Sequence, residues 1–139
     1  MFKCIVYATD GSEHARRAQK YAGDLTKLSQ AKLYIVHAYA SVSDLLGFEI
    51  YDNLLAHRIA VGRKILRETQ EYFESAQIEY QTELMEGPMA EAIINVAEAR
   101  GADLIIVGVR GRSSLEGLVL GSVSQKIIHH STCPVLVVH

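Results

Sequence analysis

The chain has 139 residues, of which 49% are apolar and 22% charged, and its formal net charge is −2. This length predicts one domain, over residues 1–139, that can bury a single good core. The slightly negative charge argues against nucleic-acid binding. No run approaches the ~20 apolar residues of a membrane span, and the apolar start is too short for a signal peptide. We therefore expect a cytoplasmic protein without membrane insertion.

The first part of the chain predicts a strand, a helix and a second strand. Residues 3–10, KCIVYATD, form a short apolar run that ends in turn-forming residues. Ser12 follows as a candidate helix N-cap, and apolar residues then recur at helical spacing to about residue 29. Residues 32–40, KLYIVHAYA, predict the second strand, in which His37 is more typical of a packed residue than of a metal ligand.

The middle of the chain repeats this alternation. Residues 41–52 show no regular pattern, and a long amphipathic helix is predicted over 53–76. Residues 78–85 alternate in polarity and predict a third strand. Pro88 is placed at or near the first position of the next helix, which Gly101 ends as a C-cap.

The last part predicts two more strands around a short helix. Residues 103–109 are almost continuously apolar, which suits a strand covered on both faces. A helix is expected over 122–130, and residues 134–139, PVLVVH, form the fifth strand. Strands that alternate with helices predict an α/β fold, a doubly wound open parallel sheet with helices on both faces. Ligands bind such sheets beyond the carboxyl ends of the strands, where the strand order reverses.

Cysteines and histidines give no sign of a metal site. Cys4 and Cys133 lie near opposite ends of the chain without a Cys-x-x-Cys pair, so we expect both to be small hydrophobic residues. His129 and His130 are adjacent, and on a helix their side chains diverge by about 100°. No metal bound by side chains is therefore predicted.

Glycines and hydroxyls follow the fourth strand at a distinctive spacing. In IIVGVRGRSSLEGLVLGSVS, residues 105–124, Gly108 and Gly111 are separated by two residues, and nine residues lead on to Gly121 and Ser122. Glycine lets backbone N–H groups lie close to a bound group. The first N–H groups of the helix after Gly121 have no intrahelical partners and carry partial positive charge. This arrangement predicts an anion site, most naturally for a phosphate chain.

Neighbouring side chains could contribute to the same anion site. Ser124 offers a second hydroxyl, and Arg110 and Arg112 offer positive charge, although Arg112 alone is more typical of a solvated surface residue. The motif is not a P-loop, because no Lys follows the glycines, and it is not a dinucleotide fingerprint. The alternative is a Gly-rich turn that only lets a strand and a helix pack.

The whole chain resembles the universal stress protein family, and in particular its ATP-binding branch. IVYATDGSEHARRAQKYA, residues 5–22, is similar to the family's opening strand, turn and helix, and residues 86–138 resemble its C-terminal half. The glycine motif matches the family's nucleotide signature, G-x-x-G, nine residues, G-[S/T]. The resemblance implies a Rossmann-like sheet of order 3-2-1-4-5, similar to that of the adenine nucleotide alpha hydrolases.

The resemblance also implies the parts of a nucleotide site. Asp10 would lie by the ribose or base, where sequence alone suggests a turn or capping residue. Ala8 and Thr9 would line the same wall, Ala38 would face adenine through its backbone, and Val107 would contact the base or ribose. The ribose and the first phosphates would be surrounded by Gly108, Arg110 and Gly111. The remaining phosphates would be bound by Gly121, Ser122, Val123 and Ser124.

The function implied is that of an ATP-binding regulatory protein of the stress response, a nucleotide-dependent switch with slow or no hydrolysis. Its ligand would be ATP, ADP or AMP, with Mg carried by the phosphates, and a protein partner is possible. The alternative is a genuine ATPase, which needs an activated water and charge neutralisation at the transferred phosphoryl group. Asp10 is the only acid placed near the site. A relation to the ATP pyrophosphatases is disfavoured, because their Ser-Gly-Gly-x-Asp-Ser loop is replaced here by residues 8–12, ATDGS.

The last strand, Val135–Val138, predicts a homodimer. It is apolar throughout, and the implied order puts it at an edge of the sheet, where unpaired backbone groups invite association. Antiparallel pairing with a second copy about a two-fold axis would complete both edges. The alternative is that residues 41–52 cover this edge, although the same segment could also close over the nucleotide site.

Overall fold

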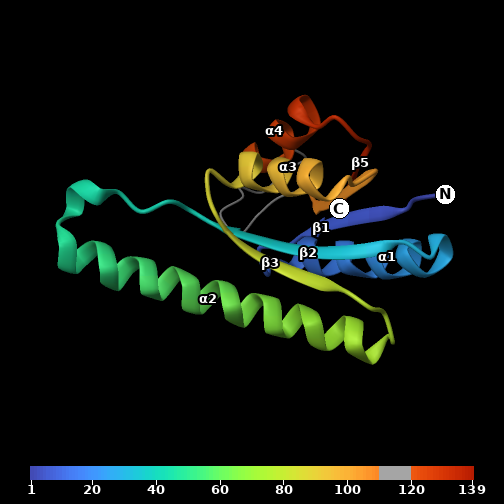
Figure 1. Cartoon of the computed structure of the whole chain (residues 1–139), viewed down its shortest axis with the longest axis horizontal. Coiled ribbons are helices and arrows are strands. Elements are labelled where there is room, and N and C mark those ends of the chain that lie inside the picture. The colour runs from blue at the N-terminus through green and yellow to red at the C-terminus, as the bar shows by residue number, and fades with distance from the viewer. Residues whose placement is uncertain (110–119) are drawn as a thin grey trace.

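A parallel sheet of five strands lies between two layers of helices in the computed structural model, which describes residues 1–109 and 120–139 (Figure 1). The sheet has the order β3-β2-β1-β4-β5, and this confirms the predicted doubly wound fold and its strand order. Its elements are β1 (Cys4–Ala8), α1 (Glu13–Ser29), β2 (Lys32–Tyr39), the 3-10 helix η1 (Asp44–Leu46), α2 (Phe48–Ser75), β3 (Gln81–Glu86), α3 (Met89–Arg100), β4 (Leu104–Gly108), α4 (Ser122–His130) and β5 (Val135–Val138).

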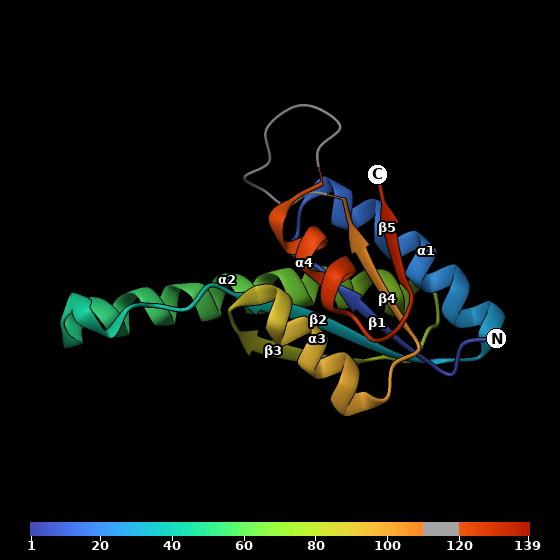
Figure 2. The same ribbon diagram turned by 90° about the horizontal axis from the view of Figure 1, so that it is seen from above.

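Each face of the sheet has its own hydrophobic core. Successive strand residues point to opposite faces, so Tyr7 packs with Phe73 beneath α1 and α2, while Val6 packs with Ile127 beneath α3 and α4. The side chain of Phe73 is completely buried, which stabilises the fold by about 2–3 kcal/mol. Figure 2 shows the sheet from above, with α1 and α2 on one side of it and α3 and α4 on the other.

Two predicted helix caps are confirmed, and both cysteines behave as packed residues. The Ser12 hydroxyl accepts from the Ala15 N–H at 3.2 Å, and Gly101 ends α3 in the left-handed conformation at φ 66°. Cys4 is buried, and burial raises the pKa of its thiol. Cys133 is partly buried against the same core, and both thiols are free.

The predicted boundaries of the middle segments were wrong in two places. Helix α2 begins at Phe48, five residues before the predicted start, after Gly47 adopts a φ of 88°. Its first turns project beyond the sheet (Figures 1 and 2), so no buried face imposes helical periodicity on their apolar residues. Strand β3 begins at Gln81 rather than at residue 78, because the N–H of Ile78 still closes the end of α2 by donating to the Phe73 carbonyl at 2.9 Å.

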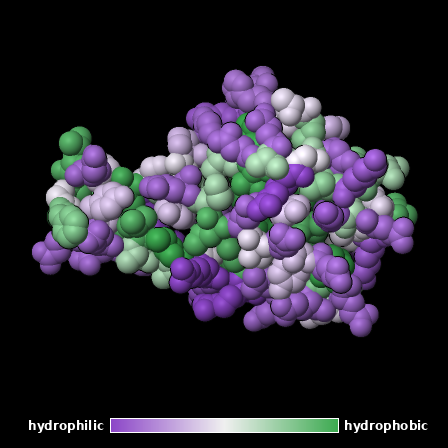
Figure 3. All heavy atoms as spheres, viewed as in Figure 1, coloured by the Kyte–Doolittle hydropathy of each residue, from purple (hydrophilic) through white to green (hydrophobic). Residues whose placement is uncertain are grey.

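The projecting end of α2 does not cover the β5 edge. Residues 41–52 extend away from the body of the molecule on the side opposite β5 (Figure 2). Hydrophobic side chains gather at this end (Figure 3), with Leu45 and Phe48 92% and 83% exposed. Among the described residues, none of the helices combines the length and the apolar character needed to cross a membrane.

Candidate functional site

A crevice opens at the carboxyl edge of the sheet because β1 ends before its neighbours. Strand β1 pairs with β2 as far as Ala8, opposite Val36, and with β4 as far as Tyr7, opposite Ile106. Strand β2 continues to Tyr39 and β4 to Gly108. The strand order reverses between β1 and β4, so this crevice lies where open α/β sheets bind ligands.

The turn after β1 is held by its own side chains. The Asp10 Oδ1 accepts from the Ser12 N–H at 2.9 Å, and the Thr9 Oγ1 accepts from the Gly11 N–H at 3.1 Å. Gly11 permits the turn with a φ of 77°. Asp10 therefore has the turn role that the sequence alone suggests. Its carboxylate is also held, half-buried, at the rim of the crevice.

The end of β2 offers a free backbone edge to the crevice. The Val36 carbonyl accepts from the Thr9 N–H at 2.9 Å, and the Tyr39 carbonyl, on the other side of the strand, accepts from the Gly87 N–H at 2.6 Å. Strand residues alternate between these two sides, so the N–H and C=O of Ala38 face the β1 side, as those of Val36 do. Because β1 has already left the sheet, none of the described strands pairs with Ala38 on that side.

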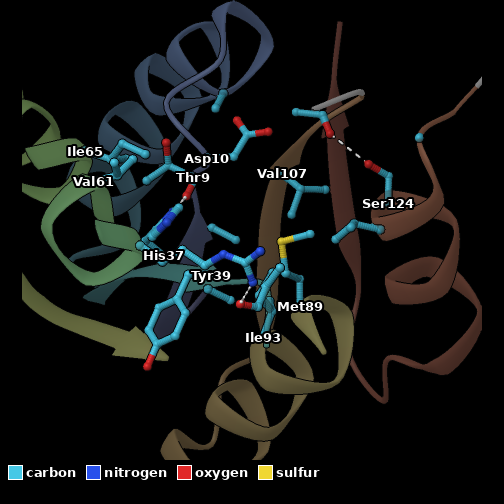
Figure 4. Close-up of a pocket in the computed structure, with 18 of the residues that line it drawn as sticks. Thr9, Asp10, His37, Tyr39, Val61, Ile65, Met89, Ile93, Val107 and Ser124 are labelled. Carbon is cyan, nitrogen blue, oxygen red and sulfur yellow. Dashed lines mark hydrogen bonds between the residues drawn. The ribbon is translucent and has the colours of Figure 1, made fainter. Parts of the chain in front are cut away.

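His37 ties the end of β2 to the turn after β1. Its Nδ1 lies 2.8 Å from the Thr9 carbonyl oxygen (Figure 4). A carbonyl oxygen only accepts, so the Nδ1 carries the hydrogen and donates it. The residue is buried and packed, as the sequence indicates, and it also lines the crevice.

The first turn of α4 closes the opposite side of the crevice. Gly121 is the N-cap residue, its N–H donates to the Val109 carbonyl at 3.0 Å, and it has no side chain with which to cap the helix. The N–H groups of Ser122, Val123 and Ser124 therefore lack intrahelical partners. The Ser124 hydroxyl donates to the Gly108 carbonyl at 2.9 Å (Figure 4), so it anchors α4 to β4. In this arrangement the N–H of Ser124 has no intrahelical partner, while its hydroxyl is engaged with the Gly108 carbonyl.

The start of α1 explains why position 108 needs glycine. A Cβ at Gly108 would lie 2.8 Å from both the Ala15 nitrogen and the His14 carbonyl carbon. The Tyr7 hydroxyl donates to the Ala15 carbonyl at 2.5 Å, and burial raises the pKa of Tyr7 above its usual range. The missing side chain of Gly108 thus serves helix packing, the alternative that sequence leaves open, even though Gly108 also lines the crevice.

Together these elements enclose a pocket of about 550 Å³. This volume lies within the range of about 300–1,000 Å³ found for small-molecule sites. Ten of the twelve predicted site residues line it: Ala8, Thr9, Asp10, Ala38, Val107, Gly108, Gly121, Ser122, Val123 and Ser124. The other two, Arg110 and Gly111, lie outside the described residues, as does Arg112.

Several lining residues on α2 and α3 were missed by the sequence analysis. In Figure 4, Val61 and Ile65 of α2 lie on one side of the pocket, and Met89 and Ile93 of α3 lie below it. The full set that was missed is Ala15, His37, Tyr39, Ala40, His57, Arg58, Val61, Ile65, Met89 and Ile93. The apolar lining residues of α2 and of α3 are four positions apart, so each set lies on one face of its helix. The same spacing is typical of core residues, so it does not identify a pocket.

Few charged side chains are found among the described residues that line the pocket. Asp10 supplies the one carboxylate among the described lining residues, while His57 and Arg58 are its basic groups on α2. No lysine lines the described pocket. Within residues 1–109 and 120–139, no three His, Cys, Asp or Glu side chains are grouped so that they could hold a metal ion. The pocket is therefore apolar along its walls, with backbone donors at α4 and one acid at the rim.

The model of the universal stress protein family matches residues 1–139. A universal stress protein of Thermus aquaticus is 38% identical over 138 residues, which cover 99% of this chain and 99% of that protein. The solved structure of hypothetical protein MJ0577 has a TM-score of 0.89 and 28% identity, over 99% of this chain and 96% of that one. A universal stress protein solved in complex with cAMP has a TM-score of 0.72 and 31% identity, over 99% of this chain and 97% of that one.

Proposed function

The chain belongs to the universal stress protein family, and we propose that it is a regulatory protein that binds ATP at the carboxyl edge of its sheet. One observation carries this proposal: the free backbone edge of Ala38 and the uncapped first turn of α4 lie on opposite sides of one pocket. A backbone N–H and C=O can pair with the edge of a base, and a helix N-terminus binds phosphate. The relative solved with cAMP supports an adenine nucleotide as the ligand.

The walls of the pocket suit the parts of such a nucleotide. A base beside Ala38 would contact the apolar side chains of Val61, Ile93 and Val107. A ribose at the rim would meet the Asp10 carboxylate, which keeps acceptor capacity beyond its bond to the Ser12 N–H. The phosphates would take the free N–H groups at the start of α4. Mg would be carried by the phosphates, since Asp10 is the one carboxylate on the described walls.

The direct test is to denature the purified chain and to identify any released nucleotide by mass. We expect an adenine nucleotide, and calorimetry with ATP, ADP and AMP then shows which of the three binds best. GTP serves as the matched control because it carries the same phosphates on another base. A chain that carries no nucleotide and shows no binding heat with ATP would contradict the proposal.

We expect hydrolysis of bound ATP to be slow, well below the range of about 1–100 s⁻¹ typical of kinases. The described pocket lacks a lysine, and its one carboxylate, on Asp10, already accepts the Ser12 N–H at 2.9 Å. A steady-state phosphate-release assay measures the rate, with Gly121→Val as the control for contaminating enzymes. Release at about 1 s⁻¹ or faster that disappears in this variant would favour the alternative, a genuine ATPase hydrolysing ATP to ADP.

We also propose that the nucleotide state alters contacts with a partner protein, and that the chain forms a homodimer through Val135–Val138. The support for the dimer is the position of β5 at the edge of the sheet. The cytoplasmic location stays a prediction from composition.

A further inference from the structure

Arg58 reaches from α2 to the end of β2. Its Nη1 donates to the Ala40 carbonyl at 2.6 Å and to the Ser41 carbonyl at 2.8 Å. Arg58, Tyr39 and Ala40 all line the pocket. The guanidinium therefore bridges a helix and the backbone that leaves the strand, inside the candidate nucleotide site.

The same backbone is held from its other side by the turn before α3. The Ser41 hydroxyl donates to the Gly87 carbonyl at 2.6 Å, and the Gly87 N–H donates to the Tyr39 carbonyl at 2.6 Å. A Cβ at Gly87 would lie 3.0 Å from the Tyr39 carbonyl oxygen, so the two segments are in close contact. Residues 39–41 are thus clamped between Arg58 and Gly87.

The clamp acts on the backbone edge that faces the pocket. Strand β2 ends at Tyr39, so the Ala40 carbonyl that Arg58 binds lies directly beyond the strand, two residues after the N–H and C=O of Ala38. Arg58 occupies the Ala40 carbonyl, whereas no described strand pairs with the N–H and C=O of Ala38. Without Arg58, the edge would offer a second carbonyl acceptor two residues further on, and only Gly87 would hold the segment.

We propose that Arg58 is a positioning residue that fixes this edge for recognition of the base, and that it thereby sets the preference for adenine. The inference rests on the proposed function. Arg58 acts here through Ala40 and Ser41, so its loss affects the base end of the site and leaves the phosphate end at α4 unchanged. Ligands with and without phosphates should therefore lose affinity by the same factor.

Calorimetry with adenosine, ATP and GTP tests this role in the wild type, Arg58→Ala and Arg58→Lys. We expect Arg58→Ala to weaken adenosine and ATP alike by about tenfold, the loss expected for a charged hydrogen bond. The ratio of ATP to GTP affinity should fall, and Arg58→Lys should restore part of both. Thermal stability should change little, because these hydrogen bonds are solvent-exposed. Arg63→Ala, at an exposed position on the same helix, is the matched control and should change nothing.

Ser41→Ala gives an independent check, because it removes the hydrogen bond from the Ser41 hydroxyl to the Gly87 carbonyl and leaves α2 unchanged. We expect the same pattern as for Arg58→Ala, with a smaller loss. A loss for ATP without a loss for adenosine would make Arg58 a phosphate ligand and overturn the inference. Unchanged affinities in Arg58→Ala, with a wild type that binds ATP, would overturn the inference alone. A wild type that binds neither ligand would overturn the proposed function and this inference with it.

Discussion

Replacing Gly121 by valine is expected to abolish ATP binding and to leave the fold intact. Gly121 has φ −65° and ψ 158°, an extended conformation that any residue adopts, so the substitution adds no backbone strain. The new side chain would stand beside the free N–H groups at the start of α4, in the proposed path of the phosphates. Two or more charge-assisted hydrogen bonds would be lost, which corresponds to a decrease in affinity of about 100-fold or more.

Calorimetry with ATP and Mg, and in parallel with adenosine, measures this effect. Adenosine should bind the wild type and Gly121→Val equally, because it has no phosphates to meet the valine. Gly108→Ala provides the contrast, since its Cβ would lie 2.8 Å from the Ala15 nitrogen. Such overpacking against backbone costs about 1–3 kcal/mol of stability, so this variant should show a lower Tm. Equal ATP affinities for the wild type and Gly121→Val would refute the assignment of the phosphate site.

The sequence was most informative where burial leaves a simple pattern. Residues 103–109 could be recognised as a strand because both faces of β4 are covered, which permits an uninterrupted apolar run. The start of α2 could not be predicted, because its first turns project from the body and bury no face that would impose helical spacing. The strand order was expected from the family resemblance and not from the alternation itself, which fits several orders.

Residue types alone marked the α4 side of the candidate site, whereas the family resemblance supplied Ala8, Thr9 and Ala38 on the other side. Glycines and hydroxyls precede α4 in the sequence, and this composition is recognisable as that of a helix N-terminus that binds an anion. Val61 and Ile65 show no such mark, since apolar residues four apart also describe a core helix. Arg58 acts through the backbone carbonyls of Ala40 and Ser41, and any residue supplies a carbonyl. Contacts of that kind depend on the tertiary structure and cannot be read from residue types.

The wild-type chain is expected to be a dimer at micromolar concentration, formed by antiparallel pairing of two β5 strands. Strand β5 has β4 on one side, and its other side is an edge of the sheet. The Val138 carbonyl accepts from the Val109 N–H at 2.7 Å, and the Pro134 carbonyl accepts from the Ile105 N–H at 3.0 Å. By alternation, the backbone groups of Val135 and Val137 point away from β4, along an apolar edge that no described strand pairs and that invites a second copy. The opposite edge, β3, carries Glu83 and Glu86, which discourage such pairing.

Charged side chains at positions 135 and 137 would not be a clean test, because Val135 and Val137 pack against the core beneath α3 and α4. A proline at position 137 is sharper: it removes the outward N–H and keeps an apolar side chain, and an edge strand accepts it. Light scattering should give about twice the 15.4 kDa chain mass for the wild type, and the monomer mass for Val137→Pro at the same concentration. Leu136→Pro is the matched control, since the N–H of Leu136 points inward to β4 and its loss should lower the Tm. A monomeric wild type, or a dimer that Val137→Pro leaves intact, would show that β5 is not the interface, and neither result would bear on the nucleotide site.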